Sequence, residues 1–275
     1  QKPTATMGAV HGCHMKYVGL GAFFAYSTYL VTSESVALPD SLTSIFDSYS
    51  PLDFKTALTY WLVYAAALNL LIGLCFKLRI GQSFLMKNRT DGTIPLISYI
   101  IFHPFYIPTH LYTYIHTVIG KSHNVPVANE VLSDYWVGGR YGSELSVPLW
   151  SVTVDLTCEF QESCINNTVK YVSSPVWDGT PPSVDEVERC AVAIRDGWSG
   201  SSQNKSSASN SGPVMVHCAH GRGRSCMIAC AGLVKSGRAG TWEEAFEVVK
   251  KGRHVCKLNK GMRVRLTEWT KKYGQ

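Results

Sequence analysis

The sequence predicts an α/β domain, with a central sheet flanked by helices, that is preceded by an α-helical membrane region. Three observations lead to this prediction. The second half of the 275-residue chain alternates β-branched runs with capped helical patterns, as α/β domains do. Within it, an apolar run meets a glycine-rich turn and then a helical pattern. The first half contains a long stretch without any charge.

The membrane region is predicted to occupy residues 1–120, which hold only seven Lys or Arg and five Asp or Glu. Residues 56–76 carry no charge over 21 positions, and about 20 apolar residues suffice to cross the hydrocarbon core. We therefore expect a transmembrane helix there, with a buried core helix as the alternative. Residues 17–31 form a shorter candidate helix that could span if it were extended at both ends, or could tuck against the helix at 56–76.

Residues 94–119 are also free of formal charge, but they include three prolines and three histidines. Proline removes a backbone donor, and an unpaired polar group in hydrocarbon costs several kcal/mol. We expect this segment to be re-entrant or to lie in the membrane interface, with a bend from Pro104 to Pro108. A true span is the alternative.

The charges of the connecting segments indicate an orientation. Residues 31–55 have a net charge of −3, and residues 77–93 have a net charge of +3. Because positive loops tend to stay on the cytosolic side, the second segment is expected there. A re-entrant 94–119 then keeps the α/β domain of this integral membrane protein on a reducing side, such as cytosol, matrix or stroma. An organelle membrane, with a targeting segment removed before Gln1, remains an alternative.

The α/β domain is predicted over residues 121–275. A short strand and glycine turn are expected in "DYWVGGRYGS", and a β-branched strand at Trp150–Thr157. Ser183 and Thr241 each precede a glutamate by three positions, which predicts two capping boxes that open helices. The last helix is "GMRVRLTEWTKKY". Residues 199–212 are polar and of low complexity, and we expect a flexible insertion there.

The candidate site is the stretch "VMVHCAHGRGRS", from Val214 to Ser225. The order of strand, glycine-rich loop and helix points backbone N–H groups and a helix N-terminus into one concavity, which binds anions. Arg224 adds a planar fork that can grip two phosphate oxygens. The same positive field lowers the pKa of Cys218, so that the thiolate is the resting form at neutral pH. The implied chemistry is in-line attack on phosphorus, through a cysteinyl-phosphate intermediate.

Two other interpretations of this stretch were weighed. One is a buried structural cysteine beside a solvated basic turn. The other is a zinc site built from His217, Cys218 and His220. Adjacent ligands of this kind point in diverging directions, and no second ligand pair lies at zinc spacing. We therefore expect no metal and no cofactor.

The segment "HCAHGRGRS" resembles the His-Cys-x5-Arg-Ser/Thr signature of the cysteine-dependent protein tyrosine and dual-specificity phosphatases, and the resemblance extends over roughly residues 129–273. It implies a dual-specificity-phosphatase-like fold. It also implies that Cys218 is the nucleophile, that Arg224 binds phosphate and that Ser225 helps the thiolate to leave. His217 would orient the loop. The phosphate-binding cradle would be formed by Ala219, His220, Gly221, Arg222 and Gly223, together with Arg224.

Cys158 ends the strand that is expected beside this loop. Some lipid phosphatases that the chain resembles carry a cysteine at a similar place. The resemblance therefore implies a redox partner that could form a reversible disulfide with Cys218. A small buried hydrophobe is the alternative.

The resemblance further implies an upstream aspartic acid that protonates the leaving group. Asp178 precedes a glycine and two prolines, so it lies in a rigid turn just before a capped helix. Asp196 is a weaker candidate, Asp185 is expected to face the helix dipole, and Asp155 is expected to end a strand. Asp178 lies further upstream of the nucleophile than the resemblance implies, by about the length of the flexible insertion.

The C-terminal segment is strongly basic, because the last 26 residues carry nine Lys or Arg and one Glu. A basic surface beside a membrane attracts anionic lipid, by about 1 kcal/mol for each cation near the surface. A solvated helix face is the alternative. Nucleic acid is not expected as a partner, because no aromatic-rich reading surface accompanies the charge.

Taken together, these patterns favour a membrane-anchored phosphatase that acts on an anionic phospholipid. Arg222 supports a lipid substrate, since lipid-directed phosphatases resemble the "GRGRS" pattern, whereas Ala219 departs from the lysine that they usually carry. One alternative is a dual-specificity phosphatase that acts on a phosphoprotein at a membrane. Another is a non-catalytic subunit of a membrane-protein complex that retains the fold.

Overall fold

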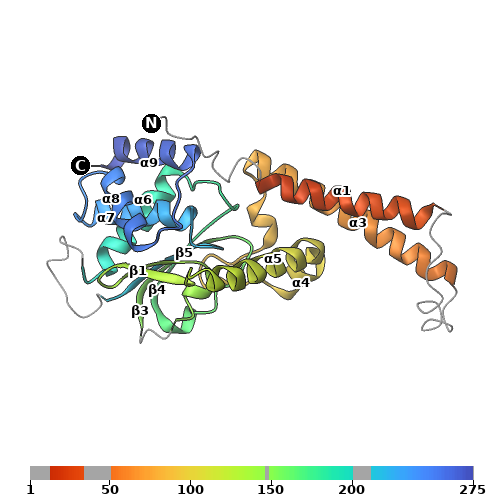
Figure 1. Ribbon diagram of the computed structural model, residues 1–275, viewed down its shortest axis with the longest axis horizontal. Helices are drawn as coiled ribbons and strands as arrows, with labels where there is room; N and C mark the ends of the chain where they lie inside the picture. The colour runs from red at the N-terminus through yellow and green to blue at the C-terminus, as the bar shows by residue number, and fades with distance from the viewer. Residues whose placement is uncertain (1–12, 34–50, 146–148, 201–211, 275) are drawn as a thin grey trace.

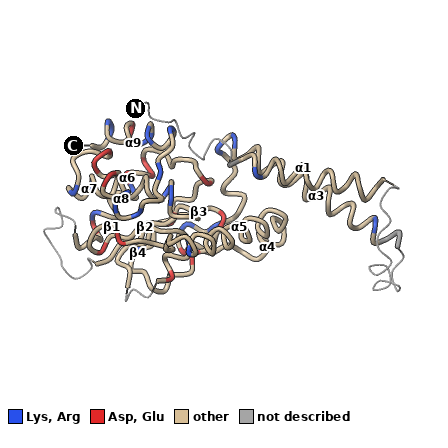
Figure 2. Tube along the Cα trace, in the orientation of Figure 1, with Lys and Arg blue, Asp and Glu red and all other residues tan. Residues whose placement is uncertain are grey.

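The computed structural model describes residues 13–33, 51–145, 149–200 and 212–274 (Figure 1). Helices α1 (Cys13–Thr32) and α3 (Pro51–Leu78) lie side by side as a long arm that extends from the rest of the molecule. Charged residues are sparse along this arm and gather on the domain that contains the sheet (Figure 2). Within the described residues, Phe54–Leu78 is the one helical segment long and apolar enough to cross a membrane. The expected span at 56–76 lies inside it.

Small residues allow the two helices of the arm to approach closely. A β-carbon at Gly21 would lie 2.8 Å from the side chain of Leu70, and one at Gly73 would lie 3.2 Å from that of Val18. Glycines at such contacts are typical of helix pairs in membranes, where close van der Waals packing drives association. The candidate helix at 17–31 is therefore part of a packed helix pair.

Residues 82–122 follow the arm and form three short elements before the sheet. The 3-10 helix η2 (Gln82–Leu85) comes first, followed by α4 (Leu96–Ile101) and α5 (His103–Ser122). Helix α4 lies away from the sheet, and α5 brings the chain back to it (Figure 1). The break between the two helices falls at Phe102, before the expected bend from Pro104 to Pro108.

Helix α5 continues through its prolines for two reasons. Pro104 lies in the first turn, where a missing N–H costs nothing. Pro108 lies inside the helix, so the carbonyl of Pro104 loses its helical donor. The buried side chain of Asn69, from α3, donates to this carbonyl at 3.3 Å and replaces the lost hydrogen bond.

The sheet has five strands in the order β1-β2-β5-β3-β4. Strand β1 (Ala128–Leu132) pairs antiparallel with β2 (Tyr135–Gly138), and the other pairs are parallel. The remaining strands are β3 (Trp150–Thr157), β4 (Thr168–Val176) and β5 (Val214–His217). Because β5 lies in the middle, the loop after it emerges at the carboxyl edge, where open α/β sheets bind their ligands.

Helices α6 (Val184–Gly197), α7 (Arg224–Lys235), α8 (Trp242–Gly252) and α9 (Lys260–Tyr273) share one apolar core with the sheet. Ser183 accepts a hydrogen bond from the backbone of the third helical residue of α6, and Thr241 forms a complete capping box on α8. Both helix starts were predicted and are confirmed, as is the sheet flanked by helices. Most of the expected insertion at 199–212 lies outside the described residues.

The segment before residue 121 packs directly against the domain that contains the sheet. Lys87 is buried against Asp155 of β3. The indole N–H of Trp177, after β4, donates to the carbonyl of Ile80 at 2.7 Å. Extensive packing therefore crosses the boundary that was expected at residue 120.

Candidate active site

The loop after β5 forms a tight cradle at the carboxyl edge of the sheet. Gly221 has a φ of +66°, and a β-carbon there would lie 2.3 Å from the carbonyl carbon of Gly138, so only glycine fits. The Cys218 N–H donates to the Gly138 carbonyl at 3.3 Å. Gly223 is the N-cap residue of α7, which begins at Arg224. The strand, glycine-rich loop and helix are therefore present in the predicted order.

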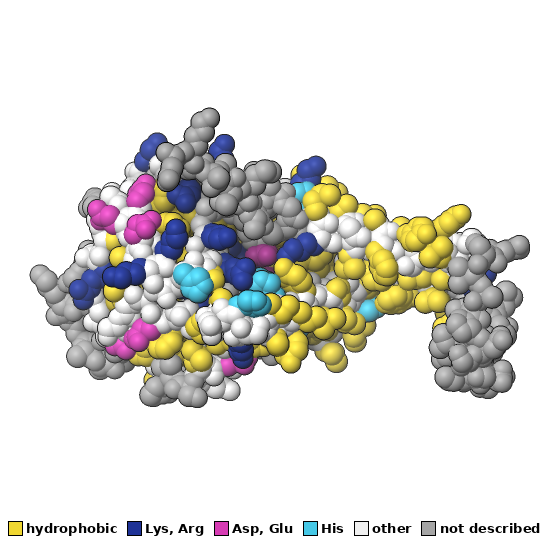
Figure 3. All heavy atoms as spheres, in the orientation of Figure 1, with side chains coloured by type: hydrophobic (Ala, Val, Ile, Leu, Met, Phe, Trp, Pro, Cys, Tyr) yellow, Lys and Arg dark blue, Asp and Glu magenta, His cyan; other side chains and the backbone are white. Residues whose placement is uncertain are grey.

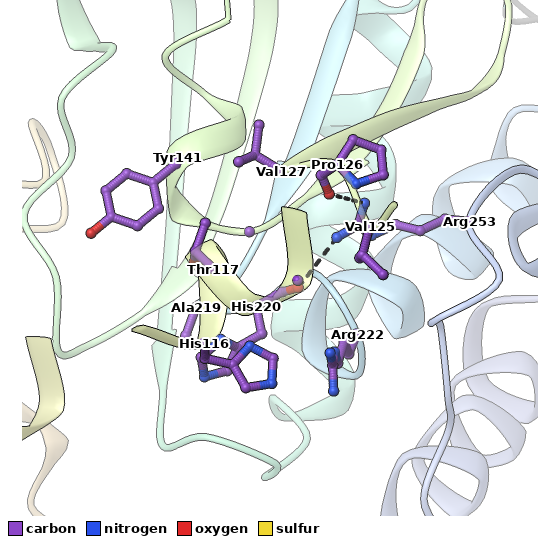
Figure 4. A pocket seen from close by; sticks show the side chains of 12 residues that line it. His116, Thr117, Val125, Pro126, Val127, Tyr141, Ala219, His220, Arg222 and Arg253 are labelled. Atoms are coloured by element: carbon purple, nitrogen blue, oxygen red, sulfur yellow. Dashed lines mark hydrogen bonds between the residues drawn. The ribbon is translucent and has the colours of Figure 1, made fainter. Parts of the chain in front are cut away.

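Arg253, just after α8, holds the outer side of this loop. Its buried guanidinium donates to the carbonyl of Gly221 at 2.7 Å. It also donates to the carbonyls of His220 at 3.3 Å and Pro126 at 3.0 Å (Figure 4). In a trans peptide the C=O and N–H groups point in opposite directions. Because Arg253 binds the carbonyls of His220 and Gly221, the N–H groups of Gly221 and Arg222 point away from Arg253, toward the concavity. In the sequence, Arg253 is one of nine cations of the basic C-terminal segment, and no local pattern indicates this role.

Cys218 is buried, with 3% of its surface exposed, and its sulfur lies 3.5 Å from the hydroxyl of Ser225. Burial by itself raises the pKa of a thiol. The charge of Arg224 and the hydrogen bonds from Ser225 outweigh burial here, so that the pKa of Cys218 lies below its ordinary value. The lowered pKa favours the thiolate, which is the nucleophilic form.

Arg224 is 1% exposed and is held in place by groups from two strands and the loop after β3. Its guanidinium donates to Glu159 Oε1 at 2.8 Å, to the Val176 carbonyl at 2.7 Å and to the Leu156 carbonyl at 3.0 Å. Glu159, which the sequence analysis did not single out, therefore orients the fork. The same guanidinium lies 3.3 Å from Asp178 Oδ1.

Of the candidate acids, Asp178 is the one that lies beside Arg224. Its side chain is 33% exposed and faces Arg224 across the cradle, whereas Asp185 and Asp196 form ion pairs with surface cations elsewhere. Burial acts to raise the pKa of Asp178, but the charge of Arg224 outweighs it and lowers the pKa below its usual value. In this state the carboxyl group is therefore ionised at neutral pH.

A buried ionic network lies behind the cradle. His217 Nε2 donates to the carboxylate of Glu162 at 2.7 Å, and a carboxylate oxygen of Asp155 lies 3.9 Å from the same nitrogen. Asp155 also pairs with Lys87 and accepts from the Tyr171 hydroxyl at 2.8 Å. Burial disfavours a charged imidazole, yet the two carboxylates outweigh it and raise the pKa of His217. The network therefore places the Lys87 ammonium and an imidazole of raised pKa against two carboxylates.

Three residues of this network could in principle hold a metal ion. Ligand atoms of Asp155, Glu162 and His217 lie within 4.8 Å of one another, and no other such group occurs among the described residues. The Lys87 ammonium already pairs with Asp155, and His217 donates to Glu162, so a metal ion would have to displace these buried contacts. The zinc set that was weighed from the sequence, with Cys218 and His220, is a different one and is not assembled here.

Cys158 is fully buried beside Glu159, and its thiol donates to Glu159 Oε2 at 3.4 Å. Burial and the neighbouring carboxylate raise the pKa of Cys158 well above its ordinary value, so it remains a thiol. Cys158 and Cys218 are both free cysteines in the structure. A reversible disulfide between them stays a prediction.

Helix α5 reaches the rim of the cradle. The ring centroids of His116 and His220 lie 4.4 Å apart, with Arg222 beside them (Figure 4), and the ring of Tyr112 meets His220 edge-on at 5.7 Å. Burial lowers the pKa of His220 to about 3, against the opposing charge of Asp178. A helix that the sequence analysis assigned to the membrane region therefore forms part of the site.

Residues 202–272 match the family model for the dual specificity phosphatase catalytic domain. The fold is that of a dual-specificity phosphatase. The matched segment contains the whole cradle and α7, and the match supports a place for this domain in the cysteine-dependent phosphatase superfamily. No curated protein sequence matches the chain.

Several solved structures are similar to the chain. Human DUSP28 has 18% identity and a TM-score of 0.43, over 55% of this chain and 97% of that protein. A mouse putative dual specificity phosphatase, complexed with zinc tungstate, has 20% identity and a TM-score of 0.41, over 54% and 88%. PTPMT1 in complex with PI(5)P has 15% identity and a TM-score of 0.41, over 53% and 96%.

Proposed function

We propose that the protein is a membrane-anchored phosphatase that hydrolyses the phosphate monoester of an anionic phospholipid. The observation that carries this proposal is that the cradle opens beside an exposed apolar helix. Helix α5 contacts His220 on one side, while Ile107, Leu111 and Ile115 on the same helix are 63%, 55% and 46% exposed. Large exposed apolar patches mark surfaces that contact protein or membrane. Figure 3 shows such side chains running from the arm to the histidines and cations at the cradle.

The arm supports membrane attachment as well. Helix α3 contains the candidate span, and residues such as Tyr60, Leu71 and Leu74 expose large apolar side chains along it. The first turn of α1 contacts α5 through Lys16 over Tyr112, and the segment just after α3 contacts the phosphatase domain through Ile80. An inserted arm would therefore leave both of its ends on the side of the membrane where the domain lies.

The first chemical step follows from the geometry of the cradle. The Cys218 thiolate attacks phosphorus and forms an S–P bond while the P–O bond to the lipid breaks. Asp178, in its protonated form, gives its proton to the leaving oxygen. A bound phosphate draws the guanidinium of Arg224 to itself, which weakens the ion pair with Asp178 and so raises the pKa of the acid toward the protonated form.

The second step returns the protein to its starting state. The Asp178 carboxylate takes a proton from water as the water oxygen attacks phosphorus. The S–P bond then breaks, the Cys218 thiolate leaves, and the Ser225 hydroxyl stabilises it by hydrogen bonding, in line with their 3.5 Å separation. The products are the lipid alcohol and inorganic phosphate.

The test is phosphate release from a panel of lipid and peptide phosphate monoesters, with detergent-solubilised protein and a malachite-green readout. We expect lipid phosphates to be hydrolysed with a higher kcat/KM than phosphopeptides, and Cys218→Ser to release none. A preference for phosphopeptides would favour the protein-phosphatase alternative. No release from any member of the panel would favour the non-catalytic one.

A further inference from the structure

We infer that the groove between α1 and α5 binds the glycerol backbone and the first acyl carbons of the lipid substrate; this inference rests on the proposed function. The groove has a volume of about 260 Å³. This is close to the lower end of the roughly 300–1,000 Å³ that is typical of sites for small molecules. Leu20 and Tyr17 of α1 form one wall, and Pro108 and Tyr112 of α5 form the other.

The groove leads directly into the cradle. Asp178, Ala219 and His220 line its inner end, and Ala219 is the residue next to the nucleophile. An acid must lie beside the oxygen that it protonates, so Asp178 marks the side on which the leaving group sits. A phosphate held over Cys218 would therefore place its alcohol part in the groove.

The walls match a lipid in polarity. Both helices that form the groove also carry exposed apolar residues on their outer surfaces, including Phe23 on α1 at 61% and Ile107 on α5. The chain of a bound lipid would leave the groove along surfaces that the proposed function places in hydrocarbon. The side chain of a phosphoserine is too short to fill such a groove, and a peptide would leave this apolar surface unused.

One cation stands among the lining residues from the two helices. Lys16 is exposed, and its ammonium lies 4.2 Å from the centroid of the Tyr112 ring. It therefore adds positive charge between the solvent and the cradle. This charge complements an anionic headgroup, while the walls at Leu20 and Pro108 are apolar.

The experiment measures the chain-length dependence of kcat/KM for dibutanoyl and dihexanoyl phosphatidic acid in the full-length protein. Both lipids are kept below their critical micelle concentrations, so adsorption to an interface does not contribute. We expect kcat/KM to rise about four-fold for each methylene that the groove buries. Activity on p-nitrophenyl phosphate serves as the reference, since this substrate has no acyl chain.

Two variants at one position and a matched control complete the test. Leu20→Trp fills the groove and is expected to abolish the chain-length dependence, with the lipid rates of each variant divided by its own rate on p-nitrophenyl phosphate. Leu20→Ala, which cannot clash, is expected to weaken the dependence. Phe23→Trp changes an exposed residue less than one turn away on the same helix that does not line the groove, and it should behave as wild type.

The outcomes separate this inference from the proposed function. The inferred lipid-binding groove would be refuted by lipid hydrolysis without chain-length dependence in the wild type, or by an unchanged dependence in both Leu20 variants. Either result would still agree with a lipid phosphatase. Hydrolysis of phosphopeptides with no hydrolysis of either lipid would overturn the proposed function, and the groove site with it.

Discussion

Replacing Lys87 by methionine should destabilise the phosphatase domain severely. The side chains of Lys87 and Asp155 are each only 1% exposed, so the substitution would leave a buried carboxylate without its cation. Removing one partner of a buried ion pair typically costs about 3–5 kcal/mol. The ammonium also donates to the carbonyl of Thr157 at 2.9 Å and to its hydroxyl at 3.0 Å, and methionine cannot replace these bonds.

The assay is urea unfolding of the detergent-solubilised protein, followed by tryptophan fluorescence at pH 7. The pKa of Asp155 is lowered in the folded state: burial opposes ionisation, but Lys87 and His217 outweigh it. A lowered pKa contributes stability that is present above the unfolded value of about 3.9 and is lost as the pH falls through the folded value. At pH 7 the contribution is therefore complete, and the full cost of the substitution should be visible.

Two controls make the result interpretable. Arg89→Met, in the same segment, breaks an ion pair with Glu186 in which the arginine side chain is 55% exposed, and it should cost about 1 kcal/mol or less. Lys87→Met combined with Asp155→Asn removes the unpaired charge and should recover part of the loss. The reasoning would be refuted if the Lys87→Met protein were as stable as the Arg89→Met protein. It would also be refuted if the double variant lost more free energy of unfolding than the Lys87→Met and Asp155→Asn changes lose in total.

Four further predictions concern the site and the membrane region. Cys218→Ser should abolish turnover yet still bind vanadate or phosphate, because the cradle is mostly backbone; retained hydrolysis would exclude the covalent intermediate. Arg224→Lys should lower kcat/KM severely, since an ammonium cannot make the bidentate grip, and near-normal rates would mean that another residue holds the phosphate. Asp178→Asn should lower turnover of alkyl phosphates by about 10²–10⁴, with a smaller loss for aryl phosphates; an equal loss would indicate a structural role. It should also shift the midpoint of Cys218 alkylation by iodoacetamide to lower pH, because the Asp178 charge raises the pKa of the thiol. Single cysteines placed at the exposed positions Thr90 and Ser122 should be labelled from the same side of sealed vesicles, and labelling from opposite sides would make residues 94–119 a true span.

Local sequence patterns were sufficient to predict the cradle. The strand, the glycine-rich turn and the helix follow one another within a dozen residues, so their signals are all contiguous in the chain. The same holds for the two capped helices, because a capping box spans only four positions. Strand β4 was not predicted, since its residues are only partly buried and include Pro175 near its end.

The supporting side chains could not be predicted from spacing. Three charged residues hold the cradle and its supporting network from positions distant in the sequence: Glu159 and Glu162 in the loop after β3, and Arg253 after α8. Each has the local sequence context of an ordinary surface charge. Lys87 belongs to the positive segment 77–93, whose charges were expected to face the cytosolic side, whereas tertiary packing buries its side chain. The contact of His116 with the cradle could not be predicted from the neighbouring residues, because α5 has the sequence pattern of an apolar helix with polar interruptions.

The end of α3 has a consequence for how the protein could meet its substrate. The ring of Phe76, in the last turn of that helix, lies 5.4 Å from the ring of Trp177, and the same tryptophan donates to Ile80. Within the described residues 79–127, no flexible tether therefore separates the candidate span from the α/β domain. With the arm inserted as proposed, the domain would keep a fixed height and tilt at the headgroups. Such a protein would act only in cis, on molecules brought to it by two-dimensional diffusion within its own membrane.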